Sequence, residues 1–369
     1  MGLSIGIVGL PNVGKSTLFN ALSNAGAQAA NYPFCTIEPN VGVVPVPDDR
    51  LDKLSALYKP KKTTPTSLEF VDIAGLVRGA SKGEGLGNQF LANIRQTDAV
   101  LYVLRCFEDS NITHVEGSVD PVRDAQVVDT ELMLKDLESI EKRRERTGKM
   151  VKAAGKAGEE AKAELALLDK VKAKLDDGVP VRAQPLSKDE KAALRELFLL
   201  TDKPVLYIAN VDEKSLGNED ANPHVQAVKK LAEREGAPVV TICAELEAQI
   251  QALPPEERPD FLASVGLTEP GLHKLVRAGY QLLGLITYFT AGEDECRAWT
   301  IKKGTLAPGA AGVIHTDFEK GFIKANVIAM DDLLAHKSEA AVKEKGLLRI
   351  EGRDYVVKDG DVMHFMFNV

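Results

Sequence analysis

Nine residues near the start of the chain constrain its fold more than any other stretch. The segment Gly9-Leu10-Pro11-Asn12-Val13-Gly14-Lys15-Ser16-Thr17 has the form G-x-x-x-x-G-K-[ST], a phosphate-binding loop. The apolar residues 3–8 predict a buried strand before it, and residues 16–22 predict a helix after it. Glycines let backbone N–H groups surround phosphate oxygens, and a helix N-terminus adds positive charge. This setting argues against a turn that contains Lys-Ser by chance.

The loop predicts which residues bind a nucleoside triphosphate. We expect Lys15 to reach the β- and γ-phosphates and the Ser16 hydroxyl to ligate Mg²⁺. The predicted nucleotide-binding set also includes Asn12, Val13, Gly14 and Thr17.

A second motif, Asp72-Ile73-Ala74-Gly75, ends a predicted strand 56 residues after Ser16. A D-x-x-G there can place the Asp72 carboxylate on the Mg²⁺ shell and the Gly75 N–H on the γ-phosphate. Thr36 lies in the intervening loop, and its hydroxyl would close over the metal. The alternatives are a common strand-end turn and an ordinary loop threonine.

A third motif, Asn210-Val211-Asp212-Glu213, follows the predicted strand 204–210, where a GTP-binding protein carries N-K-x-D. Asn210 fits, but Val211 replaces the lysine and Glu213 replaces the aspartate. A capping Asn-x-Asp at a strand-to-helix turn is the alternative interpretation.

Composition limits the class of protein. The net charge of −8 argues against nucleic-acid binding by the whole surface but leaves room for a local basic patch. The four cysteines are widely spaced, form no C-x-x-C, and suggest neither a zinc site nor a disulfide framework. The sequence begins without the features of a signal peptide and has no apolar run long enough to span a membrane, so we expect a cytoplasmic protein without a membrane partner.

Strand and helix signals alternate along residues 1–120 and again from 204, which predicts a doubly wound, mostly parallel α/β sheet. Between them, Ala154, Ala161, Leu168 and Leu175 recur every seven residues, which predicts a coiled-coil-like helical hairpin. Residues 142–174 contain eleven Lys or Arg and five Asp or Glu. This segment is either a solvated helix tip or a basic arm that contacts RNA.

The C-terminal part differs again. Strand-like runs separated by turns indicate a small α+β module of about five strands. These runs cover residues 297–301, 311–314, 318–323, 355–357 and 362–367.

Together these motifs resemble the Obg-like ATPase family of the translation-factor-related GTPase superfamily, which includes bacterial YchF. The resemblance covers essentially the whole chain. It implies a P-loop domain over residues 1–120 and 203–282, a helical insert over 121–202, and a ubiquitin-like β-grasp (TGS) domain over 283–369. The residues that carry it lie in the segments 9–17, 31–39, 72–76, 210–213, 297–304 and 312–323.

The resemblance also implies chemistry. It implies ATP as the preferred nucleotide and association with ribosomes, with the large subunit, rRNA or tRNA as contacts, and no DNA. The backbone of Cys243-Ala244 would contact the base, although many relatives have Ser-Ala there. Asn12 matches an asparagine of relatives activated by K⁺, the alternative being a turn-forming residue.

Leu76 stands where a Ras-like enzyme carries the glutamine that orients water, and leucine cannot do this. The candidate substitute is His114, which the resemblance favours over a plain loop histidine. The sequence thus predicts a Mg²⁺-dependent ATPase that acts as a switch. Two alternatives stay open, a GTPase of the same fold and a nucleotide-gated binding module with incidental hydrolysis.

Overall fold

The computed structural model describes residues 3–28, 40–73 and 86–368. Contacts divide the chain into two compact units. The first takes its residues from 1–24, 37–42 and 69–274, and the second from 25–36, 43–68 and 275–369. The contacts therefore group residues 43–68 with the C-terminal part, whereas the sequence pattern predicts that they belong to the first domain.

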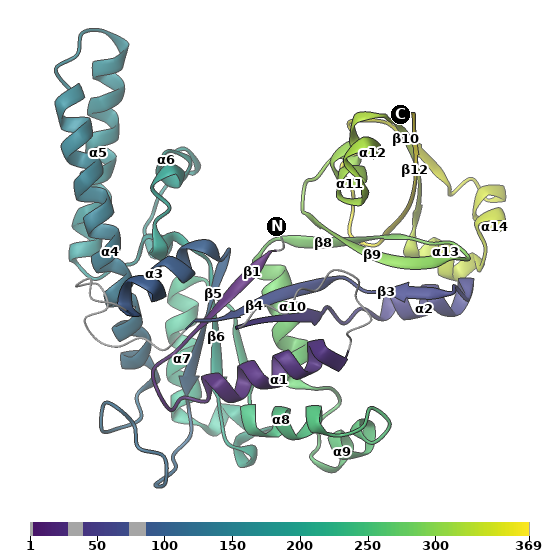
Figure 1. The fold of residues 1–369 in the computed structure, drawn as a ribbon, viewed down its shortest axis with the longest axis horizontal. Coiled ribbons are helices and arrows are strands. Elements are labelled where there is room, and N and C mark those ends of the chain that lie inside the picture. The colour runs from purple at the N-terminus through teal and green to yellow at the C-terminus, as the bar shows by residue number, and fades with distance from the viewer. Residues whose placement is uncertain (1–2, 29–39, 74–85, 369) are drawn as a thin grey trace. The chain divides into compact units, whose positions relative to one another are not determined.

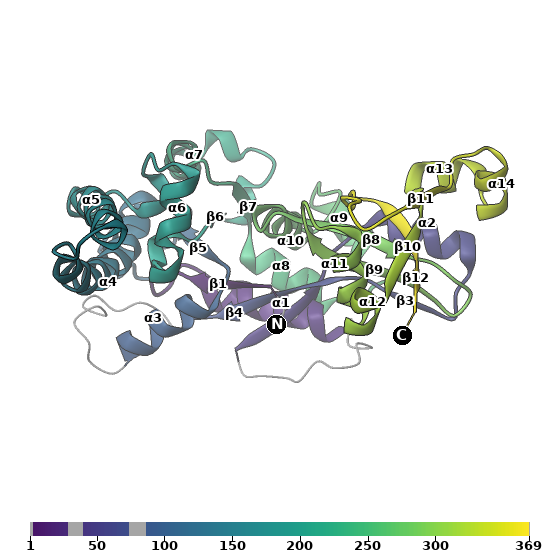
Figure 2. The ribbon, with the colours of Figure 1, turned by 90° about the horizontal axis from the view of Figure 1, so that it is seen from above.

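Most residues of a six-stranded sheet of order β2-β4-β1-β5-β6-β7 belong to the first unit, whereas residues 43–45 of β2 and 67–68 of β4 are grouped with the second. Strands β1, β5 and β6 each pair in parallel with both of their neighbours in this order. Strand β2 lies at the edge of the sheet, as Pro45 predicts. The central strands β1, β5 and β6 are buried along their whole length because helices cover both faces of the sheet (Figure 2). The predicted doubly wound sheet is confirmed. The strands are β1 (Ser4–Val8), β2 (Val41–Pro45), β4 (Ser67–Asp72), β5 (Ala99–Arg105), β6 (Val205–Asn210) and β7 (Val239–Ile242).

The helices of this sheet follow its strands in sequence, as an α/β fold requires (Figure 1). They are α1 (Lys15–Gln28), α3 (Leu86–Gln96), α7 (Pro223–Glu235), α8 (Ala244–Ala252), α9 (Arg258–Ser264) and α10 (Gly271–Leu282). Short 3₁₀ turns lie before β6 and between β6 and α7.

Two long helices, α4 (Pro121–Met150) and α5 (Lys156–Asp176), lie side by side and form an arm (Figure 1). The Asp120 side chain caps α4 by accepting a hydrogen bond from the Arg123 N–H. Apolar side chains one heptad apart, such as Leu168 and Leu175, face α4 and pack in one cluster with Ile140. The predicted helical hairpin is confirmed. The short helix α6 (Lys188–Leu194) follows it.

The second unit contains a six-stranded mixed sheet of order β11-β10-β12-β8-β9-β3. The hairpin β8–β9 is antiparallel, and the last strand, β12, returns parallel to β8. This is the strand arrangement of a β-grasp. The strands are β3 (Lys62–Thr64), β8 (Leu285–Thr290), β9 (Glu295–Lys302), β10 (Phe322–Ala329), β11 (Arg349–Glu351) and β12 (Asp361–Phe367), and the helices are α2 (Asp49–Tyr58), α11 (Ala307–Ile314), α12 (Thr316–Lys320), α13 (Met330–His336) and α14 (Glu339–Glu344).

The C-terminal prediction is wrong in all or part of three of its five runs, and it missed strands β8 and β11. Residues 311–314 belong to helix α11, because Ala307, Ala310 and Ala311 bury one helical face and a proline opens the helix. Residues 355–357 form only an isolated bridge through Val356, and residues 318–320 belong to α12. Strand β11 was missed because three residues are too few to show a period.

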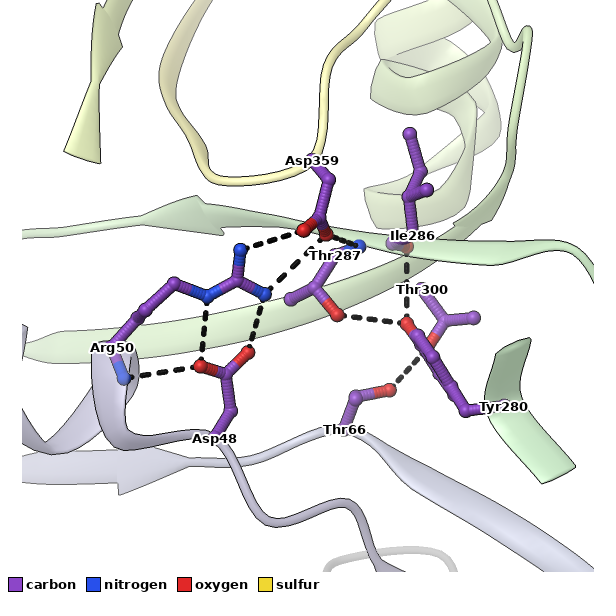
Figure 3. A network of polar contacts seen from close by, with 8 residues as sticks. All are labelled: Asp48, Arg50, Thr66, Tyr280, Ile286, Thr287, Thr300 and Asp359. Atoms are coloured by element: carbon purple, nitrogen blue, oxygen red, sulfur yellow. Dashed lines mark hydrogen bonds and ion pairs between the residues drawn. The ribbon is translucent and has the colours of Figure 1, made fainter. Parts of the chain in front are cut away.

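A polar network explains why residues 43–68 join the second unit (Figure 3). Arg50 pairs with Asp48 at 2.7 Å and with Asp359 at 2.8 Å, and Asp359 also accepts the Thr287 N–H. The Thr66 hydroxyl hydrogen-bonds to that of Thr300. Strand β3 adds to β9 in the same sheet.

Among the helices of the described residues, none combines the length and the apolar character needed to cross a membrane.

Candidate nucleotide-binding site

The phosphate-binding loop lies between buried β1 and the start of α1, as its sequence predicts. Asn12 and Gly14 both adopt positive φ, 64° and 92°. A Cβ on Gly14 would lie 2.2 Å from the Asn210 amide nitrogen, so glycine is required there for close approach as well as for φ. The loop therefore exposes its backbone at the N-terminus of α1, where an anion is favoured.

Asn210, at the end of β6, ties two loops together. Its amide nitrogen donates to the Val13 carbonyl at 2.8 Å, and its amide oxygen accepts the Ala244 N–H at 3.0 Å. All three residues are at most 4% exposed. Asn210 thus joins the phosphate-binding loop to the Cys243-Ala244 segment, and its amide is already engaged on both sides.

Lys15 and Asp72, predicted to bind phosphate and metal respectively, form an ion pair with each other. The Lys15 Nζ lies 2.5 Å from Asp72 Oδ1, and the two side chains are 11% and 19% exposed. The ammonium thus lies beside the carboxylate that closes β4, at the same end of the sheet as the loop. Ser16 is exposed in the first turn of α1, and Thr17 is half-buried.

The predicted base-binding residues divide into buried and exposed positions. Val211 is 2% exposed and donates its N–H to the Ile242 carbonyl, so its side chain packs in the core. Cys243 and Ala244 are also buried and begin α8. Burial raises the pKa of the Cys243 thiol, and the charges of Glu245 and of the exposed Glu213 act in the same direction. Of this set, only Glu213 presents its side chain to solvent.

His114 is held inside its loop. Its Nε2 lies 2.8 Å from Asp124 Oδ2, its Nδ1 accepts the Glu116 N–H at 3.1 Å, and the residue is 7% exposed. Burial raises the pKa of Asp124, while His114 and Arg123 act in the opposite direction. In this conformation both ring nitrogens have protein partners.

Sequence reasoning missed the residue that organises this loop. Arg105, 1% exposed at the end of β5, donates to the carbonyls of Phe107, Asp109 and Ile112. The sequence did contain a signal for Arg105, because a single charged residue in an otherwise apolar strand is unusual. Asn12 also contacts the loop, donating to the Thr113 carbonyl at 3.0 Å. The phosphate-binding loop and the His114 loop are therefore joined directly.

Three predicted positions, Thr36, Gly75 and Leu76, lie outside the described residues. Within the described ones, His, Cys, Asp and Glu side chains gather nowhere in groups of three or more that could hold a metal ion. Cys106, Cys243 and Cys296 are buried free thiols.

Comparisons with known proteins add to this geometry. A family model described as "50S ribosome-binding GTPase" matches residues 4–134, and one for the C-terminal domain of YchF GTPases, described as a protein of unknown function, matches residues 285–368. "Ribosome-binding ATPase YchF" of Escherichia coli O157:H7 is 58% identical and that of Bacillus subtilis 53% identical, each over 369 residues and 100% of both chains. The solved structure of the Schizosaccharomyces pombe YchF GTPase is 40% identical, with a TM-score of 0.90 over 99% of this chain and 98% of that one.

Proposed function

The chain belongs to the YchF family, and on that basis we propose that it is a Mg²⁺-dependent ATPase that hydrolyses ATP to ADP and phosphate and associates with ribosomes as a nucleotide switch. The relatives named above are called ribosome-binding ATPases. The observation that carries the proposal is the meeting of Lys15 and Asp72, two residues 57 positions apart that phosphate and metal binding both require. Association with ribosomes would place the protein in the cytoplasm.

The residues present fit a Mg²⁺ ion. Mg²⁺ takes oxygen ligands and is usually held by one or two protein groups together with substrate phosphates rather than by a protein cage. The exposed Ser16 hydroxyl and the Asp72 carboxylate are such groups, and Thr36 is the proposed third. Bound there, Mg²⁺ would neutralise charge on the phosphates.

Lys15 has a proposed role in both states of the site. Without nucleotide, the Lys15 ammonium pairs with the Asp72 carboxylate. Both side chains are largely buried, and the pairing avoids the cost of burying either charge alone. With ATP bound, Lys15 turns to the β- and γ-phosphates and leaves Asp72 free to serve the metal. Exchange of one anion for another keeps the ammonium paired throughout.

The residues at the base-binding position favour ATP over GTP. Guanine offers N1–H and N2–H₂ donors, which the aspartate of N-K-x-D accepts as a pair. Glu213 is one methylene longer, and at position 211 a buried valine replaces the lysine stem that covers the ring. Guanine donors left unpaired in a closed site cost roughly 1–3 kcal/mol, about 5- to 150-fold in affinity. Adenine has no such donors at these positions.

Slow intrinsic turnover is part of the proposal. His114 is the proposed group that orients the attacking water, and it must first leave Asp124. The Gly75 N–H is the proposed contact to the γ-phosphate. Asn12 is the proposed K⁺ ligand through its amide oxygen, since its amide nitrogen already donates to Thr113.

A GTPase of the same fold is the second candidate. The S. pombe relative is called a GTPase, and so is the family that matches residues 4–134. Exposed Glu213 is also free to rotate toward guanine. The deciding measurement is a pair of dissociation constants, for ATP and GTP, in one Mg²⁺ and K⁺ buffer. GTP binding as tight as ATP or tighter overturns the ATPase assignment.

The binding-module alternative is separated from an enzyme by turnover. ATP hydrolysis measured with and without purified ribosomes should show slow basal turnover and acceleration by ribosomes. Turnover that stays at the rate of the Lys15→Ala variant under both conditions would favour the binding module.

A further inference from the structure

Most of the positive charge on the helical arm is offset locally. Of the eleven Lys and Arg residues between 142 and 174, seven form ion pairs with a nearby carboxylate. Arg143 and Arg144, for example, reach across to Glu164 and Asp169 on α5, each at 2.6 Å. Most of these pairs lie within the hairpin, and Lys170 pairs with Glu190 of α6. The paired cations are Arg143, Arg144, Lys156, Lys162, Lys170, Lys172 and Lys174.

The four other cations are all exposed, and within the described residues none has an ion pair. Lys142, Arg146 and Lys149 follow one another on α4 at spacings of four and three residues, so they share one face over about 10 Å of helix. Lys152 is the second residue after the last helical residue of α4. We call these four residues the α4 stripe.

The α4 stripe points away from α5. On α4 the residues that face the hairpin interior are Ile140 and Thr147, both at most 2% exposed, and Lys142 and Lys149 lie about 140–180° around the helix from them. Two acidic residues adjoin the stripe, Glu145 at its margin and Glu138 one turn before Lys142, and Glu138 is already paired with Lys135. Together with Glu145, the four cations leave a net charge of +3. The protein as a whole carries −8, so this local excess is opposite to the overall charge.

We propose that the α4 stripe binds the phosphate backbone of ribosomal RNA. This inference rests on the proposed association with ribosomes and names its contact. The outward face of α4 between 138 and 149 contains only charged and polar side chains, and the exposed Met150 is a single apolar side chain at the end of the helix. The stripe therefore lacks the apolar cluster that a protein interface needs at its centre. Phosphate recognition needs no such anchor, because release of counterions drives it.

The test compares two charge-matched triple variants of the full chain. The stripe variant is Lys142→Gln, Arg146→Gln, Lys149→Gln. The control variant is Lys156→Gln, Lys162→Gln, Lys174→Gln, which removes three exposed lysines of α5 that have carboxylate partners. Affinities for purified ribosomes and for protein-free ribosomal RNA are measured over a range of KCl concentrations.

We expect the stripe variant to bind both probes at least tenfold more weakly at low salt, with the slope of log affinity against log salt reduced by about 2–3. The control variant should keep the wild-type affinity within about threefold, and both variants should keep the basal ATP hydrolysis. Equal losses in the two variants would overturn the inference, as would wild-type affinity in the stripe variant.

A stripe variant that loses affinity for ribosomes but not for protein-free RNA would show a ribosomal protein as partner, and would also overturn the inference. Failure of the proposed function looks different. In that case the wild-type chain itself binds neither ribosomes nor RNA, and both proposals are lost together.

Discussion

Asn210 offers the sharpest test of how the site is built. Its position in the third motif suggests a residue that reads the base, but its amide instead joins the Val13 carbonyl to the Ala244 N–H. The variant Asn210→Ala removes both hydrogen bonds at once. The carbonyl and the N–H left behind belong to residues that are 1% and 3% exposed, so water replaces the lost partners poorly.

Each buried backbone group without a partner costs roughly 1–3 kcal/mol, so Asn210→Ala should lower the free energy of unfolding of the first unit by about 2–6 kcal/mol. Urea unfolding followed by far-UV circular dichroism measures this loss. The single tryptophan, Trp299, belongs to the second unit, and its fluorescence reports whether that unit is unaffected.

Because Asn210 positions the phosphate-binding loop, its loss should weaken ATP and GTP by the same factor. Asn218→Ala is the matched control, since Asn218 is exposed and its side chain makes no helix-capping hydrogen bond; it should change stability by no more than about 0.5 kcal/mol. A stability loss below about 1 kcal/mol in Asn210→Ala, or a change of more than about tenfold in the ratio of ATP to GTP affinity, would refute this account.

Four other predictions follow from the site. Lys15→Ala should cost roughly 1.5–3 kcal/mol of triphosphate affinity, measured by calorimetry, and unchanged affinity would remove the phosphate-site assignment. Glu213→Asp should raise GTP affinity relative to ATP at least about fivefold, whereas adding Val211→Lys should destabilise the fold, because position 211 is 2% exposed; no gain for GTP would mean that the base is chosen elsewhere. Hydrolysis should be faster in K⁺ than in Na⁺, and equal rates would exclude Asn12 as a K⁺ ligand. Single-turnover hydrolysis should slow by roughly 10²–10⁴ in His114→Ala, and wild-type rates there would leave His114 without a catalytic role.

The parts of the fold that follow from local pattern were predictable. Strand β1, the glycine loop and the start of α1 lie within one stretch of sequence, so the pattern and the structure coincide. The heptad spacing of Leu168 and Leu175 likewise predicted the arm. The parallel sheet followed because buried strands alternate with helices.

Features that depend on distant partners were not predictable. Nothing in residues 48–66 shows that Arg50 pairs with Asp359, 309 positions later, or that β3 extends the second sheet. The charge count over residues 142–174 indicated a basic arm but could not separate Arg143, which pairs across the hairpin, from Arg146, which lies in the α4 stripe. Pairing is decided by which face of the helix meets α5.

The hydrogen bonds of His114 restrict the role that its residue type suggests. The Nδ1 atom can accept the Glu116 N–H only if it carries no proton, so the ring proton lies on Nε2 and is donated to Asp124. This tautomer leaves no lone pair for a water, and a hydrogen bond to a charged group must break before the ring can act, at a cost of roughly 1.5–3 kcal/mol. That cost alone would slow hydrolysis by about 10- to 150-fold. The loop that holds His114 also accepts a hydrogen bond from Asn12 through Thr113, so contacts at the phosphate-binding loop act directly on this restraint. If His114 is the water-orienting group that we propose, its bond to Asp124 would account for slow basal turnover and would give a bound ribosome a specific equilibrium to shift.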